Sequence, residues 1–597
     1  MILHNFHIPV LGLVFTLDTP LKVARYGISS VVSIVDDIII ESVRKFHLEK
    51  SKKVFLPILT SEDDYRAKRI TAYLNMLNEM IAIQFEEMKK QEFIAGSDLT
   101  KYFEMLPIKS DLKQQYLLMI EIKDDSLKQK LQTLLKRRMV LGSIDVNIMS
   151  KVDKLNLNKK GESTGDINSD ALSALRGFGN SNLTSSLILS AGMNPRLYSY
   201  LESFSDFLPD AQQHLKKKII LKVSDFRSAF IQAKFLAKKG IWVSEFRVES
   251  GLNCGGHAFA TEGFLLGPIL EEFKNKRTSM VSELFTMYQK ALETKQIQID
   301  GAPALKITVQ GGIGTADEHN FLLDYYQLDR AGWGSPFLLV PEATNVDEET
   351  LRNLVDATQS DFYISGSSPL GIPFNNFRKS SSEQQRLDRI AKNRPGSPCT
   401  KKFLVSNTEF TTKPICTASR EYQNLKIKEL ENENLQNEAH QTRYNIITEK
   451  ICLCEGLVNS FFKINQPVKS KQNSAVAICP GPNLAYFKDT YTLNEMIKHI
   501  YGEINLLDGV HRSHIFINEL RLYIDYLKKD ISLTLQDANV KRLKYFENFK
   551  QQLQLGINYY KEIGPLILNK KHDLAKKFSV DLLEMELKLN GLNIEVG

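Results

Sequence analysis

The chain has 597 residues, of which 43% are hydrophobic and 25% are charged, and it carries a formal net charge of +7. This composition is ordinary for a globular protein, and the charge is too small for the length to predict a nucleic-acid partner. At roughly 100–200 residues per domain, the length predicts two to four units and a sizeable buried core.

The sequence carries no clear targeting signal and few cysteines. Its first ten residues lack the basic region and cleavage site of a secretory signal, and no apolar run reaches the roughly 18–20 residues that span a bilayer. The cysteines are too sparse for a disulfide framework in a chain of this length. They are Cys254, Cys399, Cys416, Cys452, Cys454 and Cys479. We therefore expect a cytoplasmic protein with reduced thiols and no membrane span.

Short apolar runs alternate with helix-periodic segments in the N-terminal part of the chain. Parallel strands that are buried on both faces have continuous apolar sequences of this kind. The strand candidates are residues 8–16, 30–35, 144–149, 185–192, 218–223, 242–248, 305–309 and 333–340. Eight alternating units predict an α/β fold, a (β/α)₈ TIM barrel, and a doubly wound open sheet is the alternative.

Other stretches depart from this alternation. Residues 51–136 are charged and helix-periodic, which predicts a helical insertion after the second strand. Residues 155–182 are polar and rich in small residues, as in a long loop, and residues 378–398 are typical of a linker. The predicted domains are 1–50 with 137–378 as a discontinuous barrel, 51–136 as the insertion, and 379–597 as a mainly helical C-terminal region.

The sixth strand candidate leads into Cys254-Gly-Gly-His257, a glycine turn with one histidine. Its glycines allow positive φ and the close approach of a ligand, so the turn would present His257 at a strand end. With an ordinary pKa of ~6.5, His257 could act as a general acid or base, and a hydrogen-bonded structural histidine is the alternative. Cys254 could be a nucleophile, but a buried thiol lining the pocket is the better interpretation.

Two further glycine turns follow the seventh strand candidate and begin the eighth. Gly311-Gly-Ile-Gly-Thr315 joins a strand to a helix, so its N–H groups and the helix dipole could hold a phosphate. Gly332-Trp-Gly-Ser335 comes next along the chain. The loops after the seventh and eighth strands are the usual phosphate site of a TIM barrel. Tight turns without a ligand are the alternative interpretation.

The cysteines of the C-terminal part raise the question of a metal. Cys452 and Cys454 are close in sequence, but the spacing of the set matches no standard zinc or ferredoxin pattern. We therefore expect no metal site, and a metal centre that relays electrons is a minor hypothesis.

In this order the motifs resemble those of the nitronate monooxygenase (2-nitropropane dioxygenase-like) family of FMN-dependent TIM barrels, which is similar to the flavin-type enoyl-ACP reductases. Cys254-Gly-Gly-His257 is similar to the family's AGGH or SGGH signature, Gln310-Gly-Gly-Ile313 to its AGGI turn, and Gly334-Ser335 to its G-T turn. Asn147 matches an asparagine of the third strand, and Ser365–Asn375 resembles the segment that closes such barrels.

The resemblance covers residues 1–50 and about 139–378, and it implies FMN as the cofactor. It implies that His257 exchanges a proton with the substrate. The residues implied to hold FMN are Asn147, Lys222, Gly255, Gly256, Gly311, Gly312, Gly314, Gly334 and Ser335. Asn253, Cys254 and Ser335 stand where the family has an acidic residue, an alanine and a threonine, so the resemblance implies the cofactor more securely than the substrate.

The first functional hypothesis is an FMN-dependent oxidoreductase that oxidises a small carbanion-forming substrate with oxygen, as the resemblance to nitronate monooxygenases implies. The second is an enoyl reductase that uses NAD(P)H in a lipid or polyketide pathway. A third, from a different class, is a non-catalytic flavin-binding assembly protein whose helical additions recruit partners or allow oligomerisation.

Overall fold

The computed structural model describes residues 3–150, 153–156, 162–190, 192–255, 262–433, 435–465, 473–534, 539–567 and 572–594. Eight parallel strands form a closed barrel in chain order. They are β1 (Phe6–Ile8), β2 (Ser29–Ser33), β3 (Ile144–Ile148), β4 (Ser185–Leu189), β5 (Lys217–Val223), β6 (Val243–Glu249), β7 (Lys306–Gln310) and β8 (Arg330–Gly332). His7 of β1 lies opposite Ser29 of β2 and Gly332 of β8, which closes the barrel. The prediction of a (β/α)₈ barrel is confirmed, and the open sheet is excluded.

The first and last strands differ from their predicted positions. The candidate at 8–16 overlaps β1 only at Ile8, because Pro9 has no N–H for a strand ladder. The candidate at 333–340 is wrong, since β8 ends at Gly332 and Ser335–Leu339 form a 3₁₀ helix, η5, with a proline in its first turn. A short apolar run alone does not distinguish a strand from a buried helical turn.

Helices surround the barrel. They are α1 (Thr19–Val23), α7 (Asp170–Gly179), α8 (Pro195–Tyr200), α9 (Phe226–Ala237), α10 (Leu266–Glu293), α11 (Ala316–Tyr325) and α12 (Glu348–Val355). The predicted loop at 155–182 is wrong in its second half, where Ser169 caps α7 by accepting the N–H of Leu172. Seven of the ten residues of α7 are buried, which the polar composition of the surrounding stretch concealed.

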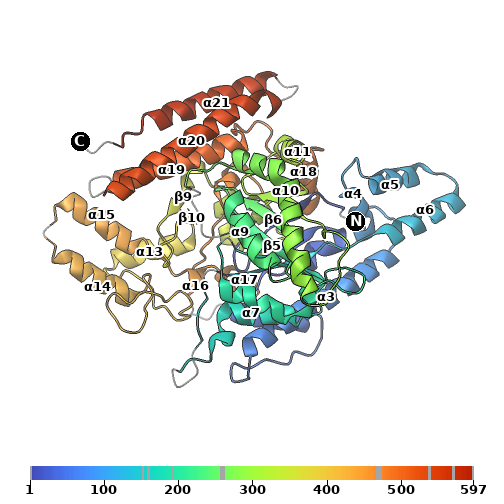
Figure 1. Cartoon of the computed structure of the whole chain (residues 1–597), viewed down its shortest axis with the longest axis horizontal. Helices are drawn as coiled ribbons and strands as arrows, with labels where there is room; N and C mark the ends of the chain where they lie inside the picture. Colours follow the sequence, from blue (N-terminus) through green and yellow to red (C-terminus); the bar gives the residue numbers. More distant parts are fainter. Residues whose placement is uncertain are drawn as a thin grey trace.

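Residues between β2 and β3 form five helices: α2 (Asp37–Lys50), α3 (Tyr65–Lys90), α4 (Asp98–Glu104), α5 (Asp111–Glu121) and α6 (Asp125–Arg138). Helix α3 packs against α2 and α7, and its apolar side, with Ile70, Leu74 and Leu77, is part of the main core. Helices α5 and α6 project from the barrel on the side opposite α14 and α15 (Figure 1). The start of this segment is therefore part of the barrel's helix layer, and its end lies outside that layer.

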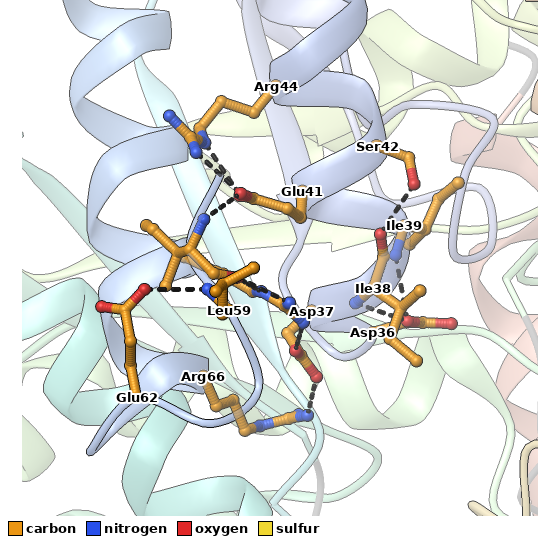
Figure 2. A network of polar contacts seen from close by, with 12 residues as sticks. Asp36, Asp37, Ile38, Ile39, Glu41, Ser42, Arg44, Leu59, Glu62 and Arg66 are labelled. Atoms are coloured by element: carbon orange, nitrogen blue, oxygen red, sulfur yellow. Dashed lines mark hydrogen bonds and ion pairs between the residues drawn. The ribbon is translucent and has the colours of Figure 1, made fainter. Parts of the chain in front are cut away.

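A polar network joins the start of α2 to the start of α3 (Figure 2). Asp36 caps α2 by accepting the N–H groups of Ile38 and Ile39 at 3.0 and 3.1 Å. Asp37 accepts hydrogen bonds from Arg66 and Arg69 of α3, both at 2.8 Å, and all three side chains are buried. Because each charge is paired, these groups can be buried where β2 gives way to the helices.

The C-terminal part begins with a two-stranded antiparallel sheet, β9 (Phe362–Ser365) and β10 (Phe374–Phe377). The predicted linker at 378–398 is wrong, because Ser380 caps a helix, α13, over Ser381–Ala391. The remaining helices are α14 (Arg420–Glu431), α15 (Asn437–Thr448), α16 (Leu453–Gly456), α17 (Asn459–Asn465), α18 (Leu493–Tyr501), α19 (Ile515–Thr534), α20 (Val540–Ile567) and α21 (His572–Asn590).

Helices α19, α20 and α21 lie side by side along one edge of the molecule (Figure 1), and α10 contacts α19 and α20. One continuous apolar core runs from Phe6 in the barrel to Phe516 and Phe549 in these helices. The mainly helical C-terminal region is therefore confirmed, and it shares the core of the barrel. Within the described ranges, no helix combines the length and apolarity needed to cross a bilayer.

Candidate active site

A cavity of about 540 Å³ lies at the C-terminal ends of the barrel strands. Pockets for small ligands and cofactors span roughly 300–1,000 Å³, so its size suits such a molecule. Of the residues implied to hold FMN, Asn147, Lys222 and Gly255 line it. The C-terminal part of the chain adds apolar side chains to the wall: Leu370, Ile372, Phe374, Leu404, Leu453 and Leu457.

One carboxylate organises the polar side of the cavity. Oε1 of Glu249, at the end of β6, accepts hydrogen bonds from Lys222 Nζ at 3.1 Å, Asn253 Nδ2 at 2.6 Å and Gln310 Nε2 at 2.6 Å. This places Lys222 beside an anionic partner at the cavity wall. Glu249 is not among the residues predicted for the site, although its spacing of two from Arg247 puts both side chains on one face of the strand.

Asn147 has an unsatisfied atom in this wall. Its Oδ1 is buried and has no hydrogen-bond partner among the described residues. Leaving a buried acceptor unpaired costs roughly 1–3 kcal/mol, and a ligand that donates a hydrogen bond would remove this cost. This acceptor therefore makes the wall at Asn147 a candidate position for a hydrogen-bond donor of a ligand. We call Asn147, Lys222 and Glu249 the barrel mouth.

Deeper in the barrel, the same strands carry buried charges that are all paired. Arg247 contacts Glu245 at 2.7 Å and Asp145 at 3.3 Å, and Arg330 contacts Glu245 at 3.6 Å. Thr308 donates its hydroxyl to Glu245 at 2.7 Å. We call Asp145, Glu245, Arg247 and Arg330 the barrel floor; no side chain of this group is more than 6% exposed.

The pKa values of the barrel floor follow from this pairing. Burial alone would raise the pKa of Glu245, but Arg247 and Arg330 outweigh it and lower that pKa to about 2. Burial raises the pKa of Asp145 above its usual value, because Arg247 compensates less there. Burial and the two arginines hold the pKa of His7 well below the ordinary histidine range. The floor is thus a closed ionic cluster beside a neutral histidine.

The glycine turns lie behind the cavity wall. Gly311 and Gly312 have φ of 106° and 81°, which favours glycine at both positions. A Cβ at Gly311 would lie 2.9 Å from the backbone of Asn253, and one at Gly334 would lie 3.6 Å from Cys254. Gly311, Gly312, Gly314, Gly334 and Ser335 do not line the cavity; Asn253 and Cys254, which do, lie beside them.

Residues from the C-terminal region contact these turns on their outer side. They are Cys479, Asn483, His499 and Arg512. No sequence motif indicated them, because each lies more than 150 residues after the turn that it contacts. Cys479 O accepts the N–H of Gly255 at 3.3 Å, and Arg512 Nη2 donates to Gly312 O at 2.7 Å. Asn483 Nδ2 donates to Ile313 O at 2.8 Å, and His499 Nε2 lies 2.9 Å from Gly314 O.

His257 and Gly256 lie outside the described residues, so the proton-transfer role of His257 stays a prediction. Gly255, which precedes them, lines the cavity with a φ of 113°. Cys254 is 3% exposed and donates its Sγ–H to the carbonyl of Cys479 at 3.0 Å. Burial raises the pKa of Cys254 well above that of an ordinary thiol, so it is a buried pocket residue and a poor nucleophile.

Four C-terminal cysteines lie near one another, although they come from three separate segments. Cys416 donates a hydrogen bond to Cys399, which lowers the pKa of Cys399 to about 7 and raises that of Cys416. The Cys452 and Cys454 thiols interact electrostatically with Cys399. In the part of the chain that the structure describes, no three histidine, cysteine or carboxylate side chains are placed to hold a metal ion.

Comparisons with known proteins found matches only among solved structures. No protein-family model matches the sequence, and no curated protein matches it. The chain is similar to FabK from Thermotoga maritima, with 13% identity over 68% of this chain and 85% of that one, at a TM-score of 0.31.

Two further solved structures match the chain with similarly low identity and TM-score. The enoyl reductase domain of MlnA, from the macrolactin biosynthesis cluster of Bacillus amyloliquefaciens, is 12% identical over 69% of this chain and 89% of its own, at a TM-score of 0.32. The nitroalkane oxidase from Streptomyces ansochromogenes is 9% identical over 84% of this chain and 95% of its own, at a TM-score of 0.33. The fold itself is established by the order of the barrel strands.

Proposed function

We propose that this chain is a flavin-dependent oxidoreductase that binds FMN at the C-terminal end of its barrel. The observation that carries the proposal is the unpaired Oδ1 of Asn147 in the wall of a 540 Å³ cavity. A flavin ring presents a ring N–H that could satisfy this acceptor. The three glycine motifs support the same cofactor through their resemblance to FMN-dependent barrels.

The described residues fit FMN at the ring end, whereas the turns assigned to its phosphate do not line the cavity. Asn147 and Lys222 offer an acceptor and a cation at the cavity wall, and Gly255 adds no side chain there. The turns at Gly311–Gly312 and Gly334–Ser335 have the glycines that a phosphate site needs, but Leu252 and Asn253 pack closely against the first turn. In this proposal Asn147 and Lys222 would hold the ring, and the two turns have no open space beside them for the phosphate among the described residues.

When bound, FMN would supply the redox chemistry. Lys222, held by Glu249, would orient the ring and add positive charge at its edge. His257 would move a proton to or from the substrate, and the apolar residues of the outer wall would exclude water. Cys254 takes no part, because its thiol is buried and bonded to a backbone carbonyl.

Two substrate classes fit this site. Oxidation of a small nitronate-like carbanion with oxygen is our first proposal, following the glycine motifs. The second is reduction of an activated double bond with NAD(P)H, and the apolar wall from the C-terminal region favours it because an acyl chain could pack there. Anaerobic mixing with NAD(P)H and a separate aerobic assay with a nitroalkane distinguish the two. Rapid bleaching of the flavin by NAD(P)H supports the reductase, and its absence together with turnover of a nitroalkane supports the oxidase.

The cofactor is tested by the absorbance spectrum of the purified protein and by the mass of any released molecule. A yellow protein that releases FMN is expected. A colourless protein that takes up no FMN would contradict the proposal. A protein that binds FMN but turns over neither substrate class would favour the assembly protein.

His257→Ala should retain FMN while turnover falls about 10²–10⁴-fold, the usual contribution of general acid–base catalysis. His214→Ala, at an exposed position, is the control and should keep full turnover. Unchanged turnover in His257→Ala would remove this histidine from the mechanism.

A further inference from the structure

We propose that Cys399 and Cys416 are a redox-active dithiol, in which Cys399 attacks an oxidant and Cys416 completes a disulfide that fixes part of the cavity wall. Neither cysteine forms a disulfide in this structure, which therefore shows the reduced pair. Both thiols belong to the C-terminal region, and their chemistry does not depend on which cofactor the barrel binds.

The backbone holds the two cysteines near each other although they are distant in sequence. Ser397 pairs with Ser419 as an isolated parallel bridge, and Ser397 donates its N–H to Ala418 O at 2.9 Å. Ser419 donates its own N–H to Cys416 O at 2.8 Å, which closes a tight turn. Cys399 lies just after the bridge on one segment, and Cys416 lies just before it on the other.

The two side chains are in direct contact but differ in exposure. Cys416 donates its S–H to the sulfur of Cys399. Cys416 is 5% exposed, whereas Cys399 is partly exposed. Cys399 also has a φ of 54°, a left-handed conformation that is uncommon for a residue with a side chain and is often found at functional sites. A reagent in solvent therefore reaches Cys399 first, with Cys416 behind it as the second thiol.

Cys399 is the more nucleophilic thiol of the pair. The S–H of Cys416 and the backbone N–H of Lys402 donate to its sulfur, and these contacts lower the pKa of Cys399 to about 7. About half of Cys399 is then thiolate near neutral pH, and the thiolate is the reactive form. The shared hydrogen bond and burial raise the pKa of Cys416. Burial also raises the pKa values of Cys452 and Cys454, so these neighbours stay protonated.

The oxidant is a hydroperoxide, ROOH. The Cys399 thiolate attacks a peroxide oxygen, so that an S–O bond forms and the O–O bond breaks; with one proton from solvent, the products are a sulfenic acid and ROH. The Cys416 thiol then attacks the sulfenic sulfur. An S–S bond forms, the S–O bond breaks, and hydroxide leaves with the Cys416 proton as water. The two cysteines lose two electrons, which the peroxide gains, and a small dithiol reverses the change by thiol–disulfide exchange.

The residues just after the more exposed cysteine carry part of the cavity wall. Phe403 and Leu404 line the cavity, and the sulfur of Cys454, another wall residue, accepts the N–H groups of both. Lys401 Nζ lies 2.9 Å from Asp36 Oδ2, which also belongs to the cavity lining. Residues 401–404 therefore connect the barrel to α16 along the cavity.

A disulfide would join this segment covalently to a second part of the wall. Next to the buried cysteine, Thr417 donates its hydroxyl to Pro369 O at 2.9 Å, and Leu370 lines the cavity. Closing a loop by a disulfide removes many of its open conformations. Oxidation should therefore reduce the motion of the wall at residues 401–404, and reduction should restore it.

The test treats the reduced protein with hydrogen peroxide and maps its disulfides by mass spectrometry of peptides. A linked pair of peptides containing Cys399 and Cys416 is expected, lighter by two hydrogens, and a small dithiol should remove the link. Cys399→Ser should abolish the reaction, whereas Cys416→Ala should stop at the sulfenic acid of Cys399. A link between Cys399 and Cys452, or a pair that peroxide does not oxidise, would overturn the proposal.

Cys452→Ser is the matched control, because Cys452 lies in the same cluster but not in the cavity lining. It should form the disulfide as the wild type does. Alkylation of Cys399 by iodoacetamide should be half-maximal near pH 7 in the wild type. In Cys416→Ala the midpoint should rise towards that of an ordinary thiol, at about pH 8.5, because the hydrogen-bond donor is gone. An unchanged midpoint would overturn the thiol contact on which the proposal depends.

Hydrogen exchange of the backbone at residues 401–404 tests the link to the cavity wall. Exchange should be about 10-fold slower or more in the oxidised wild type than in the reduced protein, and Cys399→Ser treated with peroxide should exchange like the reduced protein. A disulfide that leaves exchange unchanged would overturn this link. If the protein binds no flavin but the disulfide and the exchange result hold, the proposed function fails and the dithiol stands.

Discussion

The barrel floor and the barrel mouth share strands β3 and β6 but differ in whether their polar side chains are paired. Asp145 and Asn147 are two residues apart on β3, and Arg247 and Glu249 are two apart on β6, so each pair faces the barrel interior. In the floor, every carboxylate meets an arginine. In the mouth, the acceptor of Asn147 has no partner among the described residues.

This difference separates charges that are paired within the fold from an acceptor that the fold leaves unpaired among the described residues. A buried ion pair adds little net stability, but removing one partner leaves a buried charge uncompensated at a high cost. An unpaired amide oxygen already carries its cost in the folded protein, so removing it should cost little. Substitutions in the floor should therefore change stability, and substitutions in the mouth should change binding.

The largest effect on stability is expected for Arg247→Met, because this substitution leaves Glu245 and Asp145 without their main ion-pair partner. We expect a loss of about 3–5 kcal/mol in the free energy of unfolding, measured by urea denaturation. Lys222→Met in the mouth is the matched control and should cost about 1 kcal/mol, because Glu249 keeps Asn253 and Gln310 as donors. Equal losses of unfolding free energy in the two variants would contradict the distinction between the barrel floor and the barrel mouth.

An intermediate effect on the free energy of unfolding is expected when histidines that are buried in the neutral form become protonated at low pH. Burial lowers the pKa of His319 to about 4, and Trp333 donates its indole N–H to His319 Nδ1 at 3.1 Å. Its folded pKa lies below its unfolded value, so the unfolded chain binds the proton more tightly. The stability that this histidine contributes is complete above pH ~6.5 and is lost as the pH falls towards about 4, by up to about 3 kcal/mol.

The measurement is the urea midpoint at several pH values between 4 and 7. His319→Gln should flatten the slope over this range, since one of the titrating groups is gone. His214→Gln, at an exposed position, should leave the slope of the wild type. A wild-type midpoint that does not change with pH would show that these histidines are not buried in the neutral form.

The smallest effect on stability is expected for Asn147→Leu. Removing an unpaired buried acceptor should change the unfolding free energy of the cofactor-free protein by less than about 1 kcal/mol, with stabilisation the favoured sign. FMN binding should weaken by about 10-fold, because the ring loses a hydrogen-bond partner. Asp145→Asn, two residues earlier, should leave FMN binding unchanged. If it weakens binding as much as Asn147→Leu, the floor and mouth are one site.

The barrel was predictable because its signals are local. Buried parallel strands are apolar runs, and six of the eight candidates lie on the observed strands with small shifts at their ends. The wrong predictions come from short segments whose local sequence is compatible with more than one structure. The run at 333–340 is as apolar as a strand, but Pro336 favours a helical turn there. The predicted linker at 378–398 contains Ser380 and Glu383, the spacing of a helix N-terminus, which marks α13.

Only the part of the candidate site that lies at the ends of the barrel strands could be predicted from the sequence. Asn147, Lys222 and Gly255 line the cavity because barrel geometry brings the ends of β3, β5 and β6 together. The partner of Gly312 O is Arg512, 200 residues further along the chain. No periodicity or spacing in one sequence links two such positions, since only the packing of α19 and the segment before it places the guanidinium there.

The position of Arg512 in the chain also bears on how the protein is made. During synthesis the eight strands of the barrel leave the ribosome well before residue 512, and domains generally fold in that order. The nascent barrel would then pass through a period in which the carbonyls of Gly312, Ile313 and Gly314 have only water as partners. This turn would therefore acquire its final hydrogen bonds only late in synthesis.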